Sequence, residues 1–177
     1  MQKMRHPGPV PFRTRILAFL WDYAIIFGYI VLLVGLSYPA KPVLAPLFAT
    51  SPLLAELTGF VLITLPVYLY FAVAEGLNAH ATWGKRKMGI MVADAHGQPV
   101  GLGRSLFRSA VKWFPWELAH FTIWHMVLPS RIPDPILYVL LTAVYALVFL
   151  YLLSPLRSPV KQTVYDRLSG TFVRYRE

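Results

Sequence analysis

Long apolar runs alternate with shorter basic segments along this chain of 177 residues, and the pattern predicts membrane-spanning helices. Three runs are apolar over a length that can cross a hydrocarbon core of roughly 30 Å, at about 1.5 Å of helix rise per residue. These runs are residues 15–37, 54–75 and 136–154. A fourth run, 113–128, is shorter and contains Glu117 and His120, so hydropathy alone does not identify it as a span.

The distribution of lysine and arginine decides how many times we expect the chain to cross. Of the 17 basic residues, four lie up to Arg15, six lie in 78–112 and five lie in the tail 156–177, which leaves only Lys41 and Arg131. If the fourth run crosses, the three basic segments share the cytosolic side, as the positive-inside rule prefers. The sequence therefore predicts an all-α membrane protein with four transmembrane helices, the third short and polar, and with both termini cytoplasmic.

The polar segment 78–112 and the tail predict a small β element in the cytosol. Met91–Ala93 and Pro99–Leu102 flank a turn signal at Asp94–Gly97, which is the pattern of a hairpin. The alternating run Thr171–Tyr175 follows another turn signal. We therefore expect a cytosolic β-hairpin to which the tail can add a strand.

Prolines distinguish the remaining segments. The loop Ser37–Pro52 holds four prolines and is predicted to be irregular, because proline removes a backbone donor. In the second apolar run, Pro66 is predicted to kink the helix, with Thr64 or neighbouring helices satisfying the backbone groups that it frees. The leader Met1–Thr14 is basic and proline-rich and is also expected to be irregular.

Composition narrows the range of functions. Hydrophobic residues make up 56% of the chain and charged residues 14%, with a net charge of +9, whereas a soluble domain carries about 25% charged residues. Because the basic residues flank the apolar runs, they suit anionic lipid headgroups better than a nucleic acid. The chain has no cysteine, which excludes disulfides and thiolate metal sites.

Asp22 lies inside the first apolar run and is the main candidate for a functional acid. Burying an aspartate near the centre of a span costs about 2.5–3.5 kcal/mol, and an intramembrane acid is a functional-site hypothesis by default. The alternative is that Asp22 lies near the headgroups and pairs with Arg15 or Trp21. On the functional hypothesis, an ion- or proton-binding set comprises Asp22, Glu75, Glu117 and His120.

Other motifs are weaker. The segment around Gly84 and Lys85 lacks the spacing of a phosphate-binding loop, so we expect its glycines to form a tight turn near anionic lipid. Glu117 and His120 share a helical face with the spacing of dimetal bundles, but such a site needs a second copy of the motif. No nucleophile–base set specifies a reaction. We therefore expect a protein that is not an enzyme and has no metal and no cofactor.

Three ordered segments resemble the RDD family of small bacterial membrane proteins: TRILAFLWDYAII, ATWGKRKMGIMV and KQTVYDRLSGTFV, with GQPVGLGRSLFRSAVKWF as a similar link. The family is named for one arginine and two aspartates, which match Arg15, Asp22 and Asp166. Tyr165 replaces the histidine that the family pattern has before its last aspartate. The other matching positions are Gly84, Lys85, Gly89, Arg108, Gly170 and Thr171. The resemblance implies the bacterial inner membrane and suggests transport.

Two functions follow as hypotheses for this single domain, residues 1–177. The first is a transporter of small monovalent cations coupled to protons, with Asp22 alternately binding a proton or a cation. The alternative is a non-transporting scaffold or a module that interacts with anionic lipids. Four helices leave little room for an aqueous pathway, so we expect a homodimer or a larger homo-oligomer. On its own, Asp166 indicates an ion pair or a helix cap, whereas the resemblance to the family implies that it holds the tail against the bundle through Arg15, Arg104 or Arg108.

Overall fold

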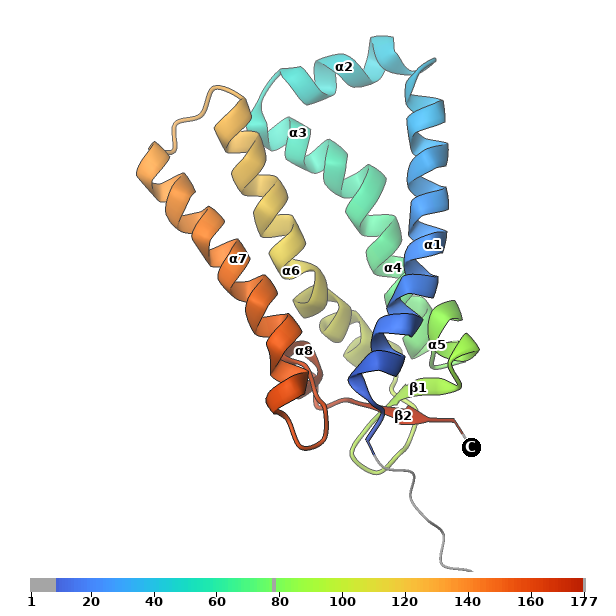
Figure 1. Ribbon diagram of the computed structural model, residues 1–177. Helices are drawn as coiled ribbons and strands as arrows, with labels where there is room; N and C mark the ends of the chain where they lie inside the picture. Colours follow the sequence, from blue (N-terminus) through green and yellow to red (C-terminus); the bar gives the residue numbers. More distant parts are fainter. Residues whose placement is uncertain (1–8, 78, 177) are drawn as a thin grey trace, which may run out of the picture.

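Helices stand side by side in the computed structural model, which describes residues 9–77 and 79–176 (Figure 1). The long helical segments are α1 (Phe12–Ser37), the continuous run α3 (Pro52–Gly59), η1 (Phe60–Thr64) and α4 (Leu65–Gly76), α6 (Leu102–Val127) and α7 (Asp134–Arg157). The short elements are α2 (Lys41–Ala49), α5 (Trp83–Lys87), α8 (Val164–Leu168), β1 (Ile90–Ala93) and β2 (Phe172–Tyr175). We call the end that carries β1, β2, α5 and α8 the sheet end, and the opposite end the α2 end.

Three helical segments in the described part of the chain are long and apolar enough to cross a membrane: Phe12–Ser37, Pro52–Gly76 and Asp134–Arg157. They correspond to the three strong runs in the sequence. The weaker run, 113–128, is the second half of α6, whose first half carries Arg104, Arg108 and Lys112. α6 is not among the helices that length and composition identify, so a fourth span does not follow from the fold.

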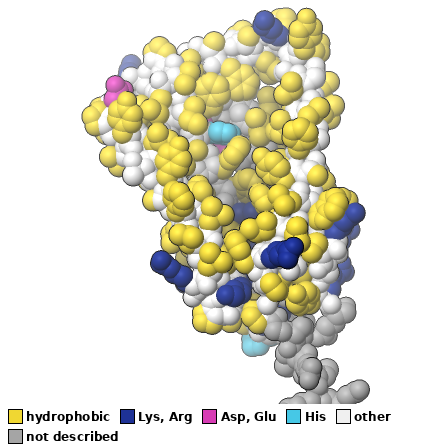
Figure 2. Space-filling view, viewed as in Figure 1, with side chains coloured by type: hydrophobic (Ala, Val, Ile, Leu, Met, Phe, Trp, Pro, Cys, Tyr) yellow, Lys and Arg dark blue, Asp and Glu magenta, His cyan; other side chains and the backbone are white. Residues whose placement is uncertain are grey.

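The outward surfaces of α1 and α7 are apolar (Figure 2). Large side chains such as Phe27 and Val139 are 63% and 67% exposed, and many neighbours resemble them. Contiguous apolar surfaces of this extent mark contact with a membrane or a partner. Combined with helix length, they indicate that these flanks face lipid.

The second span bends where Pro66 interrupts its backbone hydrogen bonds. The π-helical turn η1 immediately precedes the proline, and π turns and prolines are both known causes of helix kinks. The hydroxyl of Tyr29 on α1 donates to the carbonyl oxygen of Leu62 at 2.6 Å, which is the group that proline leaves without a donor. A neighbouring helix therefore satisfies the freed backbone, as predicted, whereas the Thr64 hydroxyl makes no hydrogen bond within the described chain.

Two segments expected to be irregular are helical. The loop prediction was wrong for residues 41–49, which form α2, because Pro42 lies in the first helical turn, where no backbone donor is needed. Pro46 is the only proline of α2 beyond its first turn, so the helix loses a single internal hydrogen bond there. In the leader, α1 already begins at Phe12, while residues 1–8 lie outside the described residues.

The β element pairs the middle of the chain with its tail. Strands β1 and β2 are antiparallel, with Ile90 opposite Tyr175 and Ala93 opposite Phe172. The expected second strand at residues 99–102 is reduced to one bridge between Ala93 and Pro99, because α6 begins at Leu102 and uses the backbone there. The predicted tail strand is confirmed, and it takes the place of the predicted hairpin partner.

Candidate functional site: a charged cavity at the sheet end

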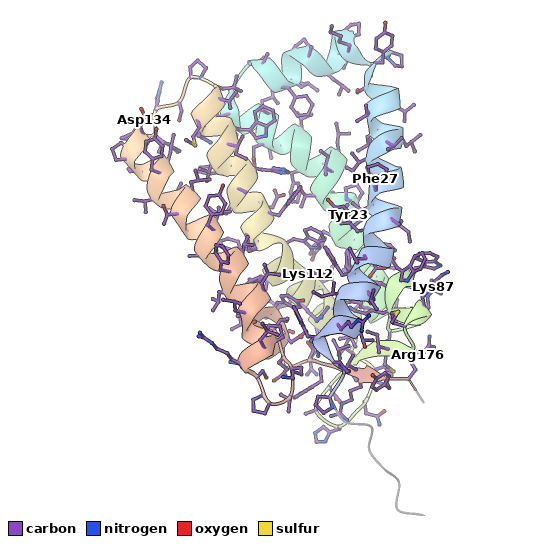
Figure 3. All side chains as sticks on the ribbon, viewed as in Figure 1. Tyr23, Phe27, Lys87, Lys112, Asp134 and Arg176 are labelled. Carbon is purple, nitrogen blue, oxygen red and sulfur yellow. The ribbon has the colours of Figure 1, made fainter. Side chains whose placement is uncertain are left out.

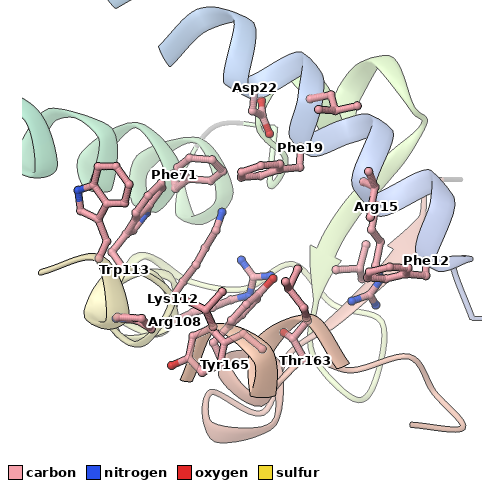
Figure 4. Close-up of a pocket in the computed structure, with 18 of the residues that line it drawn as sticks. Phe12, Arg15, Phe19, Asp22, Phe71, Arg108, Lys112, Trp113, Thr163 and Tyr165 are labelled. Atoms are coloured by element: carbon pink, nitrogen blue, oxygen red, sulfur yellow. The ribbon is translucent and has the colours of Figure 1, made fainter. Parts of the chain in front are cut away.

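A cavity of about 590 Å³ lies between α1, α6 and α7 in the half of the molecule near the sheet end (Figure 4). Most of its wall is apolar and comes from the three helices. Its charged lining residues are Arg15, Asp22, Lys85, Arg108 and Lys112. Figure 3 shows Lys112 in the space between α1 and α7, with Arg176 below it at the sheet end. The charged residues therefore gather at one side of an otherwise apolar space.

Asp22 is held by three uncharged donors. One carboxylate oxygen accepts from the Tyr70 hydroxyl at 2.8 Å and from the Gly84 amide at 2.7 Å, and the other accepts from the Thr82 hydroxyl at 2.6 Å. The residue is 1% exposed. Both oxygens are occupied, so Asp22 fastens the loop and helix α5 to the side of α1, in a manner that needs no bound cation.

Gly84 permits this attachment. A Cβ atom at residue 84 would overlap the carbonyl oxygen of Ala18 and the Asp22 side chain, so only glycine allows α5 to approach α1 this closely. Gly89 and Gly170 end α5 and α8 with φ angles of 63° and 62°, which favour glycine. The glycines singled out in the sequence therefore fix the backbone around the site.

Buried ion pairs connect five elements, α1, α4, α5, α6 and α8, at the sheet end. Glu75 at the end of α4 pairs with Lys85 and with Arg108, and Arg108 pairs in turn with Asp166 at 2.7 Å. Arg15 from α1 reaches the second oxygen of Asp166 at 3.0 Å. Removing one member of such a buried network typically costs about 3–5 kcal/mol, because its partner is left uncompensated. We call these five residues the ion-pair chain.

Asp166 is set in place by its own short helix. Thr163 and Asp166 form a reciprocal capping box at the start of α8, in which each side chain bonds the other's backbone amide. Burial alone would raise the pKa of the Asp166 carboxyl, but the guanidinium groups of Arg108 and Arg15 outweigh it and lower the pKa to about 2. Thr171, with its hydroxyl 3.5 Å from Asp166 Oδ1, closes the other side. Asp166 therefore remains charged at neutral pH.

Tyr165 occupies the position where the family pattern has histidine. Its ring lies against the Arg108 guanidinium, 5.0 Å from the centroid, and against the ring of Tyr151 at 5.6 Å. Burial raises the pKa of its hydroxyl above the ordinary value. At this position the chain therefore presents a neutral aromatic wall of the cavity.

Lys112 differs from the other basic residues of the cavity. Its ammonium group lies 3.3 Å from the centroid of Phe71 and also faces the rings of Phe19 and Trp113. Within the described chain, no carboxylate forms an ion pair with it and no acceptor forms a hydrogen bond with it. Ring faces attract a cation but accept no conventional hydrogen bond. Lys112 therefore projects an unmatched positive charge into the cavity (Figure 4).

The other predicted acid–histidine pair lies away from this site. Glu117 and His120 are adjacent on α6, with 3.7 Å between a carboxylate oxygen and the ring nitrogen. Glu56 on α3 interacts with both. The described hydrogen bonds and ion pairs connect neither Glu117 nor His120 to Asp22 or Glu75. The four predicted ion- or proton-binding residues therefore do not form one cluster, because Glu117 and His120 lie apart from Asp22 and Glu75.

Sequence reasoning missed three participants in the site. Tyr70 and Thr82 hold Asp22, but a tyrosine in an apolar run and a threonine in a loop carry no distinctive spacing. Lys112 is the third member of a basic series in which Arg104, Arg108 and Lys112 follow one another at four-residue intervals. That spacing was the available signal, because it places Lys112 on the same side of α6 as Arg108, which is buried.

Apolar helices with lipid-facing flanks, joined at one end by buried ion pairs, define an α-helical integral membrane protein. The model of the RDD family matches residues 9–170, nearly the whole chain, and the chain belongs to the RDD family. Comparisons with curated proteins and with solved structures find no match.

Proposed function

We propose that this RDD-family protein is a non-transporting module of the bacterial inner membrane whose sheet end faces the cytosol and engages anionic lipid headgroups. One observation carries the proposal: the carboxylates of the cavity and the ion-pair chain are all bonded within the protein, whereas basic side chains remain in excess. Exposed basic residues surround the sheet end and form what we call the basic collar: Arg13, Arg86, Lys87, Arg104, Arg157, Arg167 and Arg176.

The depth of the collar suits headgroup contact. The Lys87 ammonium lies over the rings of Trp21 on α1 and Trp83 on α5, at 4.6 and 4.7 Å from their centroids. Tryptophan is enriched at membrane–water interfaces, where its ring lies at headgroup level. Lysine and arginine near an anionic surface contribute about 1 kcal/mol each to attraction. The collar would thus lie at the surface of the cytosolic leaflet.

This orientation requires α6 to cross as a fourth span. Its support is that α6 packs along both α4 and α7, and that the start of α1 and the tail meet at the sheet end (Figure 1). Because the chain lacks cysteine, single variants K41C, R131C and R157C can be labelled in intact spheroplasts with an impermeant maleimide. We expect labelling at positions 41 and 131 but not at 157. Labelling at 157 and protection at 131 would contradict the fourth span.

Lipid titration tests the proposed function itself. Phosphatidylglycerol added to the purified protein should raise its unfolding temperature more than phosphatidylcholine does. The R86Q/K87Q variant should lose part of this difference, while K41Q, which changes a basic residue at the α2 end, should keep it. Equal responses to the two lipids would reject the proposal.

Cation–proton exchange is the second candidate, and one observation favours it. Glu56, Glu117 and His120 bring two acids and an imidazole together between α3 and α6, with an oxygen of each acid buried and without a hydrogen bond in the described chain. Acid–histidine groups inside membranes serve as proton relays. Such a pathway would be built most readily in a homodimer.

Proteoliposomes separate the two candidates. Wild type, D22N and E117Q are compared for proton movement driven by Na⁺, K⁺ or Li⁺. The lipid-binding proposal expects no cation-dependent flux from folded wild type. A flux that D22N or E117Q abolishes would instead establish the exchanger.

A further inference from the structure

The cavity has the two-part character of a lipid site. Arg15, Arg108 and Lys112 line one part, whereas Leu20, Val148 and Leu152 line part of the apolar remainder. Its volume of about 590 Å³ falls within the range of roughly 300–1,000 Å³ that is usual for ligand pockets. A ligand that matches the whole cavity must therefore combine a polar head with an apolar chain.

The unsatisfied groups in the charged part are hydrogen-bond donors. Arg15 donates one nitrogen to Asp166, but its buried Nε and Nη2 have no acceptor within the described chain. Lys112 likewise faces only aromatic rings. The oxygens of Asp22, Glu75 and Asp166 are already bonded. Buried donors normally find partners, so a ligand that satisfies the free donors of Arg15 and Lys112 would be an acceptor-rich anion.

The cavity opens sideways toward the lipid-facing surface. Phe19 and Leu20 on α1 and Val148 and Leu152 on α7 line it and are nevertheless 41% to 55% exposed. Figure 2 shows the surface hollowed between the two flanks. An acyl chain can therefore lie in the opening without leaving the hydrocarbon phase.

The depth of Lys112 matches the position of a lipid phosphate. Its ammonium lies 5.9 Å from the ring of Phe19, which is two residues before the interfacial Trp21 on α1. At about 1.5 Å per residue, Phe19 and Trp21 differ by roughly 3 Å along the helix. The ammonium of Lys112 thus lies beside the segment of α1 that carries the interfacial Trp21.

We propose that the cavity binds one anionic phospholipid of the cytosolic leaflet, with its phosphate between Lys112 and Arg15 and an acyl chain along α7. This inference rests on the proposed lipid-binding function and adds an internal, one-to-one site to the basic collar. Charge complementarity favours this occupant. The cavity and its ion pairs contain four basic and three acidic side chains, which leaves one positive charge for an anionic ligand to balance.

Native mass spectrometry of the full-length protein, titrated with phosphatidylglycerol or phosphatidylcholine, tests the site. Wild type should bind one phosphatidylglycerol at least tenfold more tightly than phosphatidylcholine. K112Q should weaken this binding at least tenfold, whereas K112R should retain it. K41Q is the control, because it removes an exposed charge at the α2 end, outside the collar, and should change affinity less than twofold. Unfolding temperatures of all variants establish that they are folded.

A second variant tests the apolar part. V148W fills the space along α7 and should weaken binding of phosphatidylglycerol but leave binding of soluble glycerol 3-phosphate unchanged. Glycerol 3-phosphate bound as tightly as the lipid, with no effect of V148W, would show a free-phosphate site and overturn the proposal.

The remaining outcomes separate this inference from the proposed function. Wild-type binding in both K112Q and V148W, with a loss in R86Q/K87Q, would overturn the cavity site and leave the collar function intact. No preference of wild type for phosphatidylglycerol would reject both.

Discussion

The two halves of the molecule use charge in opposite ways. Near the sheet end, the oxygens of the buried acids Asp22, Glu75 and Asp166 are all bonded, and Arg15 and Lys112 carry unsatisfied donors. Toward the α2 end, the buried charged atoms without a hydrogen bond in the described chain are carboxylate oxygens of Glu56 and Glu117. The first half can accept an anion, and the second can accept a proton or a cation. The unsatisfied basic and acidic groups thus lie at different depths of the same helical bundle.

The comparison also separates two ways of holding helices together. The ion-pair chain fixes the sheet end through Glu75, Arg108 and Asp166, each of which has at least two charged partners or donors. The other half relies on apolar contacts, on aromatic stacking of Phe48 on Trp124 and on the hydrogen bond from Tyr29 to the carbonyl oxygen of Leu62. Substitutions should therefore be far more damaging at the sheet end.

The largest effect should come from R108Q. Loss of this guanidinium leaves Glu75 and Asp166 buried without their shared cation, so the free energy of unfolding should fall by about 3–5 kcal/mol. Thermal unfolding in detergent measures the change, with R104Q as the exposed control on the same helix. If R108Q does not fold alone, E75Q/R108Q should recover part of the loss. A decrease of under about 1 kcal/mol in R108Q would contradict the importance of the ion-pair chain.

The next effect is the pH dependence that Asp166 contributes. Its pKa is lowered to about 2 in the folded protein, compared with about 3.9 in an unfolded chain. The stabilisation is therefore fully present above about pH 4 and is lost as the pH falls toward 2. Unfolding curves of wild type and D166N should differ most near pH 7 and converge on acidification. A difference that stays constant from pH 7 to pH 2.5 would refute this assignment.

A smaller loss is expected for Y29F, in the half outside the ion-pair chain. The variant removes the donor to Leu62, and interhelical hydrogen bonds in membranes average about 0.6 kcal/mol. Y23F on the same helix provides the control, because Tyr23 is 52% exposed and makes no hydrogen bond in the described chain. Thermal unfolding of the pair isolates the hydroxyl. Equal stability of Y29F and Y23F would show that the hydrogen bond from Tyr29 to Leu62 contributes nothing to stability.

The smallest effect should be that of E117Q. Glu117 meets His120 only at 3.7 Å in a partly exposed site, and such pairs contribute about 0–1 kcal/mol. E75Q makes the same chemical change in the ion-pair chain and should cost several times more. Comparing the unfolding temperatures of E117Q and E75Q tests the contrast between the two halves most directly. Similar losses in the two variants would contradict that contrast.

The sequence predicted much of this fold because hydropathy reports the environment of a span directly. The three apolar runs, the bend at Pro66 and the tail strand 171–175 all follow from local patterns. The helix α2 was not predicted. The number of prolines shows how many backbone donors are absent, but the position of each proline within a helical turn decides whether a donor is needed there. Four spans remain a prediction, since α6 is not apolar enough for composition to identify it as a span.

The site was less predictable because its contacts join distant residues. Arg15 and Asp166 are 151 positions apart, and their pairing was expected only through the resemblance to the family. The partners of Asp22 come from the end of the second span and from the next loop, which no spacing rule connects. An intramembrane acid signals that partners exist, but it does not show whether they are ions or hydroxyl groups.

The pairing of β1 with the last strand, and of Arg15 with Asp166, has a consequence for synthesis on the ribosome. The basic side chains of α1 and α6 emerge long before the aspartate that neutralises two of them. In the proposed orientation, these arginines lack Asp166 while the helices insert, when positive charge directs a segment to remain in the cytosol. The tail emerges after α7. Its Asp166 then pairs with Arg15 and Arg108 and so fixes the start of α1 to the tail.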